Sequence, residues 1–274
     1  MDFNESIMKN IGIIAGKGRF PFLVAEQIKK SGDRIVGVAL KDEASLDFES
    51  VCDVCERINV GKLQKIIDFF KSNNVDTAVM VGLVKHTKIY TAALSMDMRA
   101  VKLMASLINK KADTILAAVA EEFAREGIKF MPSHLYLKHL LAPKGLICGK
   151  KLNSQENADV EFGYKIAKAV AGLDIGQTVV VKDKSVAAVE SVEGTNDCIR
   201  RGYSLAGENA VVVKVAKPNQ DFRFDVPVIG TDTVNILAEN KIRVLAIEAD
   251  NTLILDKDEV VKNAKELNVT IIGI

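Results

Sequence analysis

The chain is predicted to be an α/β protein with two α/β domains joined by a linker, the N-terminal one built on a Rossmann-like parallel sheet. Short apolar runs alternate with amphipathic helical segments along the first half. The second half mixes strands and helices again, after a stretch rich in Pro and Gly. Alternating strands and helices form parallel sheets with right-handed crossovers. At roughly 150 residues per domain, the length of 274 residues allows one large domain or two modest ones.

The first domain, nucleotide-binding in our interpretation, is expected over residues 10–132. Its first strand, at 11–15, is an apolar run that ends at a glycine, which is typical of a buried parallel strand. The segment 63–70 carries apolar residues at helical spacing, which predicts an amphipathic helix. The other predicted elements are strands at 35–40, 75–84 and 128–131 and helices at 20–30, 98–108 and 114–125.

Residues 133–156 are predicted to be the linker, with a short helix at 134–141. Helix-breaking and basic residues gather in and beside this stretch. They are Pro132, Pro143, Gly145 and Gly149 together with Lys138, Lys144, Lys150 and Lys151.

The second domain, expected to carry the chemistry, spans residues 157–274. A hairpin is predicted at 178–182 and 186–190, since two β-rich runs flank a polar turn. The other predicted elements are strands at 210–215, 244–248, 253–255 and 269–274 and helices at 158–171, 196–205, 232–239 and 258–267.

Composition excludes several classes of protein. With 37 Lys and Arg against 36 Asp and Glu, the net charge of +1 argues against a nucleic-acid-binding protein. No apolar stretch approaches the ~18 residues that a transmembrane helix needs. The N-terminus lacks the apolar core of a secretory signal, so we expect a cytoplasmic protein with reduced thiols. The pair Cys52 and Cys55 has no second pair or nearby His, so these cysteines, like Cys148 and Cys198, are interpreted as structural.

A glycine-rich loop follows the first predicted strand. Gly16 and Gly18 can bring backbone N–H groups close to an anion, and the next helix points its N-terminus at the same place. Lys17 and Arg19 add positive charge. The loop fails the P-loop pattern because Gly18 follows Lys17, and it fails the dinucleotide fingerprint because position 21 is Pro. We therefore expect a phosphate or nucleotide site, with a tight turn that binds nothing as the alternative.

The strand at 75–84 is expected to end on the same edge of the sheet as the glycine loop. Gly82 and Lys85 are therefore candidate substrate-binding residues. Lys85, His86 and Lys88 either meet a diphosphate or form a solvated basic turn. For Asp113, which starts a predicted helix, the favoured interpretation is an ordinary acid in the first helical turn.

Two segments of the second half have unusual composition. Glu193 stands beside the predicted start of a helix that Thr195 or Asn196 would cap. Further on, cations and acids crowd between a strand and an apolar run: Lys214, Lys217, Asp221, Arg223 and Asp225. Carboxylates that hold Mg²⁺ or orient water, next to cations that neutralise phosphate oxygens, suit phosphoryl chemistry. A surface network of ion pairs is the alternative.

Over nearly its full length from residue 10, the chain resembles the LpxI-type UDP-2,3-diacylglucosamine pyrophosphatases of lipid A biosynthesis. The matching segments are IGIIAGKGRFP at 11–21, Gly82, DTIL at 113–116, IGQTVVVKD at 175–183, EGTN at 193–196 and KPNQDFRFDVPVIG at 217–230. Two positions depart from the family pattern: Ala112 stands where an Asp is expected, and Asn196 where Asp often follows EGT.

The resemblance implies two α/β domains and a hydrolase that splits the substrate's diphosphate into UMP and 2,3-diacylglucosamine 1-phosphate (lipid X). It implies a divalent cation, Mg²⁺ or another such as Mn²⁺, and attack of water on the sugar-side phosphorus. It also implies that Asp225 is essential.

Site residues are expected in three groups. The catalytic candidates are Asp225, Glu193, Arg223, Lys214 and Lys217. The substrate-binding candidates are Gly16, Lys17, Gly18, Gly82, Lys85, Gly194, Thr195 and Gln220. The candidate metal ligands are Asp225 and Asp221.

The expected partner is the UDP-diacylglucosamine lipid, with no nucleic acid and with transient contact to the inner membrane surface. The basic residues between Lys138 and Lys151 either provide that contact or belong to an exposed linker. A homodimer is left open. The alternative functions are a Rossmann-type nucleotide-sugar oxidoreductase and a non-catalytic protein that binds lipid or nucleotide sugar.

Overall fold

The computed structural model of the protein describes residues 8–84, 95–109 and 111–274. The chain forms two compact units. The first contains Met1–Leu137 and Asp221–Phe224, and the second contains Lys138–Gln220 and Asp225–Ile274. The chain therefore leaves the second unit for residues 221–224 and returns to it at Asp225.

The first unit is built on a parallel sheet in which β1 is central. The described strands pair in the order β3-β2-β1-β4-β5, every pair parallel. They are β1 (Asn10–Ala15), β2 (Arg34–Leu40), β3 (Val54–Ile58), β4 (Thr77–Val81) and β5 (Lys129–Phe130). Because parallel strands share one direction, the loops after β1 and β4 meet at the same edge of the sheet.

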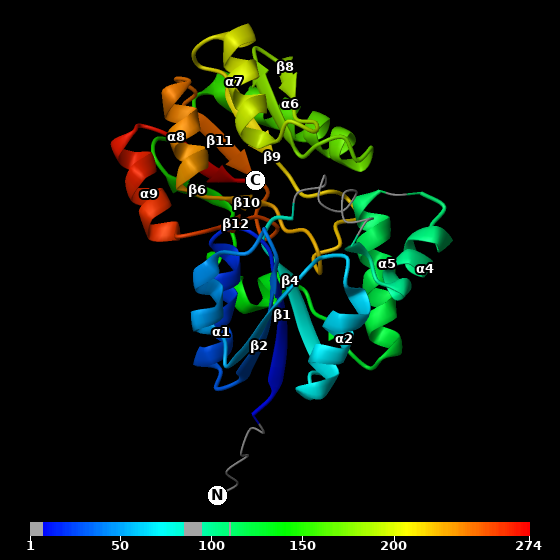
Figure 1. The fold of residues 1–274 in the computed structure, drawn as a ribbon. Coiled ribbons are helices and arrows are strands. Elements are labelled where there is room, and N and C mark those ends of the chain that lie inside the picture. The colour runs from blue at the N-terminus through cyan, green and yellow to red at the C-terminus, as the bar shows by residue number, and fades with distance from the viewer. Residues whose placement is uncertain (1–7, 85–94, 110) are drawn as a thin grey trace, which may run out of the picture. The chain divides into compact units, whose positions relative to one another are not determined.

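Helices cover both faces of this sheet (Figure 1). Apolar side chains of α2 and α5, among them Phe70 and Phe123, pack on the strands in one core. The bounds are α1 (Phe20–Lys30), α2 (Leu63–Ser72), α4 (Met98–Ser106), α5 (Ala112–Arg125) and the 3₁₀ segments η1 (Leu46–Val51) and η3 (Ser133–Leu140). Strand β3 was missed by the sequence analysis because it is a half-exposed edge strand whose residues VCERI lack a continuous apolar run.

The second unit has a mixed sheet in the order β6-β13-β11-β9-β7-β8. Strands β13, β11 and β9 are parallel, whereas β6, β7 and β8 pair antiparallel with their neighbours. The strands are β6 (Gly145–Cys148), β7 (Thr178–Lys182), β8 (Ser185–Val189), β9 (Val211–Lys214), β11 (Val244–Ile247) and β13 (Thr270–Gly273), with a separate parallel pair β10 (Val228–Ile229) and β12 (Leu253–Ile254).

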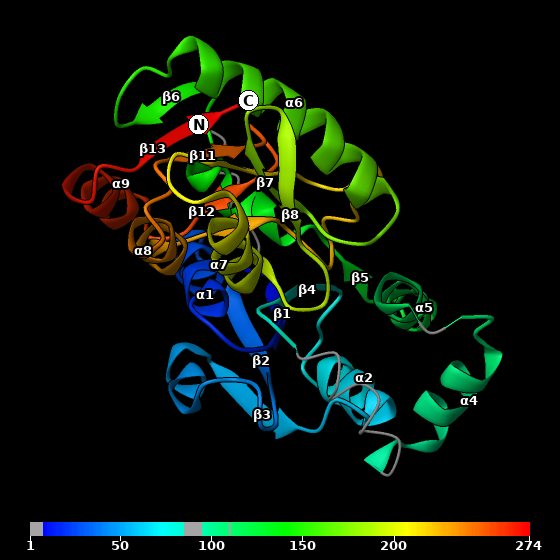
Figure 2. The ribbon, with the colours of Figure 1, turned by 90° about the horizontal axis from the view of Figure 1, so that it is seen from above.

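The two faces of this sheet belong to two cores. Helix α6 covers residues such as Val179 and Val213, and the other helices cover residues such as Val180 and Val212. Successive strand residues point to opposite faces, so a strand buried on both sides is apolar throughout. The helices are α6 (Ser154–Gly172), α7 (Thr195–Ala206), α8 (Thr231–Glu239) and α9 (Lys257–Glu266). Figure 2 shows α6 on one side of the sheet and α7 to α9 on the other.

The predicted fold class is confirmed: both units are α/β, and the first sheet is parallel. The range 133–156, expected as a linker, contains η3 and strand β6, which pairs with β13. Strand β6 was not predicted because its four residues, which lie among Pro and Gly, are too few to show a periodic pattern. Of the described helices, none combines the length and apolarity needed to cross a bilayer.

Candidate active site

Polar side chains gather in the second unit where β9 ends. The register places Thr178, at the start of β7, opposite Lys214, the last residue of β9. Because β8 runs antiparallel to β7, it also ends here, and α7 begins a few residues later. Ligands of α/β sheets bind beyond the carboxyl ends of strands, so this edge is where a site is expected.

Lys214 is a buried cation at this edge, with 9% of its surface exposed. Its Nζ donates to Thr195 Oγ1 at 2.7 Å, and Thr195 Oγ1 donates to Glu190 Oε1 at 2.8 Å. Among the described residues, no carboxylate forms an ion pair with Lys214. An ammonium group carries three donors and is costly to bury alone. Lys214 is therefore placed to receive an anion.

The N-terminus of α7 lies beside Lys214, because Thr195 is the first residue of this helix. Gly194 precedes it at φ +85°, with open space where a Cβ would stand. The backbone N–H groups of Thr195, Asn196 and Asp197 donate to no atom within the described parts of the chain. Free N–H groups and the helix dipole favour an anion, so the start of α7 and Lys214 are together a candidate site for a phosphate group.

Asp225 is held on the same network by two amides. Its Oδ2 accepts from Gln177 Nε2 at 3.1 Å and from Gln220 Nε2 at 2.8 Å. Gln177 N donates in turn to Glu190 Oε2 at 3.3 Å, which links Asp225 to Lys214 through hydrogen bonds. Oδ1 of Asp225 makes no hydrogen bond to a described residue, so one oxygen of an oriented carboxylate is available.

A partly buried ion pair, Lys168 with Glu248, stabilises the strand that carries Lys214. Lys168 Nζ lies 3.1 Å from both carboxylate oxygens of Glu248 and donates to Ala216 O at 2.8 Å. Glu248, 9% exposed, also accepts from Ala216 N at 2.8 Å. This pair fixes the backbone that leads from Lys214 to Lys217.

Cys198, the cysteine near the site, is fully buried and is a poor candidate for a nucleophile. Burial, followed by the nearby charge of Glu190, raises the pKa of the Cys198 thiol to about 12. Since the thiolate is the reactive form, covalent catalysis by Cys198 has no support.

The donors around Asp225 fit a divalent cation only in part. Gln177 Oε1 is buried and has no hydrogen-bond partner among the described residues, and an amide oxygen beside a carboxylate oxygen suits Mg²⁺. The described residues contain no cluster of three or more His, Cys, Asp or Glu able to hold a metal ion. A cation here would depend on substrate oxygens and water for its other ligands, as Mg²⁺ commonly does.

Asp221 and Arg223, predicted as metal ligand and catalytic cation, pair with each other in the first unit. Arg223 Nη2 lies 2.6 Å from Asp221 Oδ2, and Arg223 Nε lies 2.9 Å from Oδ1. This bidentate contact holds the pKa of Asp221 below its usual range. The guanidinium also lies 4.8 Å from the ring centre of Phe224, which packs on the core of that unit.

The two other predicted catalytic residues also make ion pairs. Glu193 binds the guanidinium of Arg201, which lowers the pKa of that carboxylate, and no hydrogen bond among the described residues joins it to Asp225. Lys217 Nζ lies 2.7 Å from Asp174 Oδ1, and its backbone N donates to Gln220 Oε1 at 2.9 Å.

The glycine loop of the first unit is packed against the loop after β4. Gly16 N donates to Val81 O at 2.8 Å, and Lys17 N donates to Leu83 O at 2.8 Å. A Cβ at Gly16 would lie 2.6 Å from Leu83 O, and one at Gly82 would lie 2.9 Å from Lys17 O. Packing therefore accounts for Gly16 and Gly82, and these N–H groups are already used.

Gly18 differs from its neighbours. Its φ is +105°, and a Cβ would meet nothing within 4 Å. Packing does not explain this glycine, which remains the candidate for close approach of a ligand. Lys85, His86 and Lys88 lie outside the described residues.

Four polar residues of the second-unit network were not predicted from the sequence: Gln177, Glu190, Lys168 and Glu248. Gln177 stands in the segment IGQTVVVKD and Glu190 at the end of a predicted strand, so position alone could have suggested both. Lys168 and Glu248 look like ordinary surface charges in sequence, and only burial distinguishes them.

Solved structures resemble the chain only distantly. N5-carboxyaminoimidazole ribonucleotide synthetase from Thermotoga maritima is 17% identical over 69% of this chain and 43% of its own, with a TM-score of 0.29. The biotin carboxylase subunit of pyruvate carboxylase is 14% identical over 73% of this chain and 43% of its own, with a TM-score of 0.28. The chain thus spans under half of these proteins, and the likeness carries no argument about function.

Family comparisons are decisive. The LpxI N-terminal domain matches residues 10–140, and the LpxI C-terminal domain matches residues 143–272. The UDP-2,3-diacylglucosamine pyrophosphatase LpxI of Caulobacter vibrioides is 30% identical over 281 residues, which cover 97% of this chain and 98% of the relative. With both domains matched in order and nearly the whole length aligned, the chain belongs to the LpxI family.

Proposed function

We propose that this enzyme hydrolyses the diphosphate of UDP-2,3-diacylglucosamine to UMP and 2,3-diacylglucosamine 1-phosphate in lipid A biosynthesis. The named activity of the relative from Caulobacter vibrioides supports the substrate. The observation that carries the proposal is Lys214, a buried ammonium without a carboxylate partner among the described residues, next to the free N–H groups of α7. These donors support the binding of a phosphate group at this edge of the sheet.

Asp225 is the group that we assign to the attacking water. Its Oδ2 is fixed by Gln177 and Gln220, while Oδ1 is available to accept a proton. The water oxygen bonds to the sugar-side phosphorus, and the bond from that phosphorus to the bridging oxygen breaks. The bridging oxygen leaves with UMP, and Asp225 takes a proton from the water. Such positioned proton transfer typically contributes about 10²–10⁴-fold to a rate.

Lys214 and the α7 N-terminus stabilise negative charge on the phosphate. Hydrogen-bond donors that are fixed in advance act most strongly where water is excluded, and Lys214 is buried. Lys217 lies near the same strand end, but it is already paired with Asp174. We therefore assign the main electrostatic role to Lys214.

A divalent cation would be held by Asp225 and the buried amide oxygen of Gln177. When bound, it would polarise phosphoryl oxygens and so make the phosphorus a better electrophile. Asp221 is a weaker candidate because Arg223 occupies both of its carboxylate oxygens.

The nucleotide is assigned to the first unit, at the loop around Gly18. The helix N-terminus that follows favours phosphate, and the open space at Gly18 permits close approach.

The test is UMP release from UDP-2,3-diacylglucosamine in detergent micelles, in Mg²⁺, in Mn²⁺ and in EDTA. We expect UMP with a divalent cation and little with EDTA. In ¹⁸O-labelled water the label should enter the lipid phosphate and not UMP. Absence of UMP with every cation, despite tight substrate binding, would favour the binding-only alternative.

A further inference from the structure

Helix α4 of the first unit turns a row of apolar side chains to solvent. Met98 is 70% exposed and Val101 46% exposed, and Ala105 continues the row two helical turns from Met98. Ile108, in the loop that follows the helix, is fully exposed at 103%. We call these four residues the α4 outer row. Positions i, i+3 and i+7 share one side of a helix, so they form a stripe.

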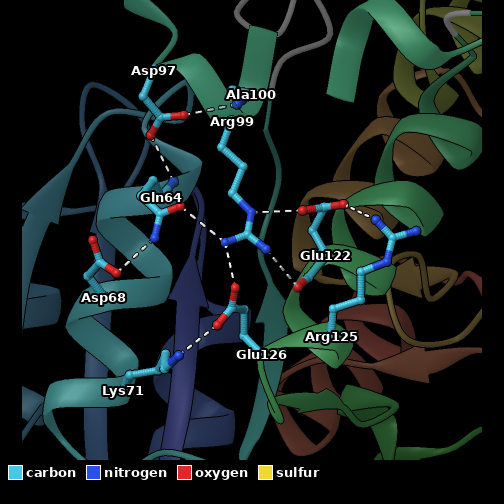
Figure 3. Close-up of polar contacts among 9 residues, drawn as sticks. All are labelled: Gln64, Asp68, Lys71, Asp97, Arg99, Ala100, Glu122, Arg125 and Glu126. Carbon is cyan, nitrogen blue, oxygen red and sulfur yellow. Dashed lines mark hydrogen bonds and ion pairs between the residues drawn. The ribbon is translucent and has the colours of Figure 1, made fainter. Parts of the chain in front are cut away.

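The opposite side of α4 is clamped to the domain by polar contacts (Figure 3). Arg99 Nε lies 2.7 Å from Glu122 Oε2, and Arg99 Nη1 lies 2.8 Å from Glu126 Oε1, both on α5. Arg99 Nη1 also donates to Gln64 Oε1 of α2 at 3.1 Å.

Asp97 ties the starts of α4 and α2 together. Its Oδ1 accepts from Ala100 N at 2.9 Å and its Oδ2 from Gln64 N at 2.8 Å. Ala100 is buried, and Leu103 packs on the core beneath. The helix is thus held rigidly by one side, so the outward apolar stripe is a fixed feature of the surface.

The charged side chains of the segment that carries the outer row are all basic. The segment from Met98 to Lys111 contains no acidic residue. Lys102, beside Val101, and Lys111, past the end of the row, are both exposed. Arg99 is neutralised by its two glutamates, so the outward charge comes from the lysines.

We propose that the α4 outer row with Lys102 and Lys111 docks on the surface of an anionic phospholipid bilayer. Interfacial helices place an apolar face at the boundary of the acyl chains and lysines against anionic headgroups. Lysines extend their apolar stems along such a face while the ammonium stays in water. This inference rests on the proposed function, since a substrate with two acyl chains must be taken from a membrane.

The test measures co-sedimentation of the full chain with sucrose-loaded vesicles. Vesicles of phosphatidylethanolamine with about 30 mol% phosphatidylglycerol are compared with pure phosphatidylcholine. The parent should prefer the anionic vesicles and be released by high salt. The double variant Met98→Glu and Val101→Glu should bind at least tenfold more weakly, since it places charge where apolar side chains are buried. Lys102→Gln should weaken binding to anionic vesicles about fivefold.

Leu46→Glu is the matched control, because Leu46 is 79% exposed on η1, away from the row. It should bind vesicles as the parent does, and circular dichroism should show every variant folded. Unchanged vesicle binding by the double variant would overturn the proposal. The proposal would also be overturned if the parent formed a dimer and the double variant lost that dimer but still bound vesicles. The α4 outer row would then be a contact with a second copy of the chain.

Hydrolysis in detergent micelles separates this inference from the proposed function. Each variant should release UMP within twofold of the parent, because the micelle delivers substrate without a bilayer. If the parent bound anionic vesicles but released no UMP, the proposed hydrolysis would be refuted and the proposed docking surface would not.

Discussion

Replacing Lys214 by Met removes a charge and keeps most of the shape of the side chain. In the folded protein Lys214 is 9% exposed, and the described hydrogen bond of its ammonium goes to Thr195 Oγ1 at 2.7 Å. If the residue served only the fold, losing it would destabilise the protein. If Lys214 instead serves to bind a phosphate group of the substrate, the variant should keep its stability and lose activity.

The expected loss follows from one charge-assisted hydrogen bond to a phosphate oxygen. Such a bond contributes about 1.5–3 kcal/mol, which corresponds to about 10- to 150-fold in kcat/KM. The stability effect should be small or favourable. The variant gives up one hydrogen bond of about 1 kcal/mol but no longer buries an ammonium that lacks an ion pair.

Lys168→Met is the matched control at the same edge of the sheet. Lys168 neutralises Glu248, whose side chain is only 11% exposed. Removing the lysine leaves a buried carboxylate without its cation, which typically costs about 3–5 kcal/mol. The Lys168 side chain is itself 25% exposed, so solvent screening should reduce this to about 2–3 kcal/mol.

Urea unfolding and UMP release measure the two effects. We expect Lys214→Met to unfold within about 1 kcal/mol of the parent and to lose activity, while Lys168→Met unfolds earlier. A Lys214→Met protein as unstable as Lys168→Met but with unchanged kcat/KM would refute the assignment of Lys214 to phosphate.

Three further predictions concern other sites. Asp225→Asn should lower kcat at least ~10²-fold with substrate affinity largely kept, and a fully active variant would move the role elsewhere. Gly18→Ala should weaken UMP binding in calorimetry. Gly32 has a similar positive φ of +80° and open space, so Gly32→Ala should lose about as much stability as Gly18→Ala but leave UMP binding unchanged. At pH 8 iodoacetamide should label Cys55, whose pKa is lowered chiefly by a hydrogen bond from Cys52, before Cys198, whose pKa burial raises to about 12. Because the folded pKa of Cys198 is raised, its contribution to stability should be complete below about pH 9 and decline as pH rises toward 12.

The sequence by itself determined the order and type of most elements. The run at 11–15, the helical spacing over 63–70 and the hairpin at 178–190 all correspond to elements of the structure. These signals are local. Side-chain directions repeat every 3.6 residues in a helix and every two in a strand, so burial of one face makes apolar residues recur at that period in the sequence. Strand β3 and strand β6 escaped because an edge position or a short length leaves the pattern incomplete.

The candidate site was only partly foreseeable. Lys214, Thr195, Gln220 and Asp225 were predicted from the motifs, and the structure joins them in one network. Gln177 and Glu190, which connect them, were not selected, although the segment IGQTVVVKD around Gln177 and the strand end at Glu190 could have suggested both. Glu193, which looked unusual beside a helix start, makes a surface ion pair with Arg201.

Only the tertiary structure decided which of the crowded charges stand free and which are satisfied. Within a few residues of sequence, Asp221 and Arg223 pair in the first unit while Asp225 returns to the second. Lys214 reaches the start of α7 because β7 and β9 run antiparallel in a register that sets Thr178 opposite it. Register and crossover join residues far apart in the chain, and no local period records them, so the chemistry of the site depends on contacts that the sequence pattern does not contain.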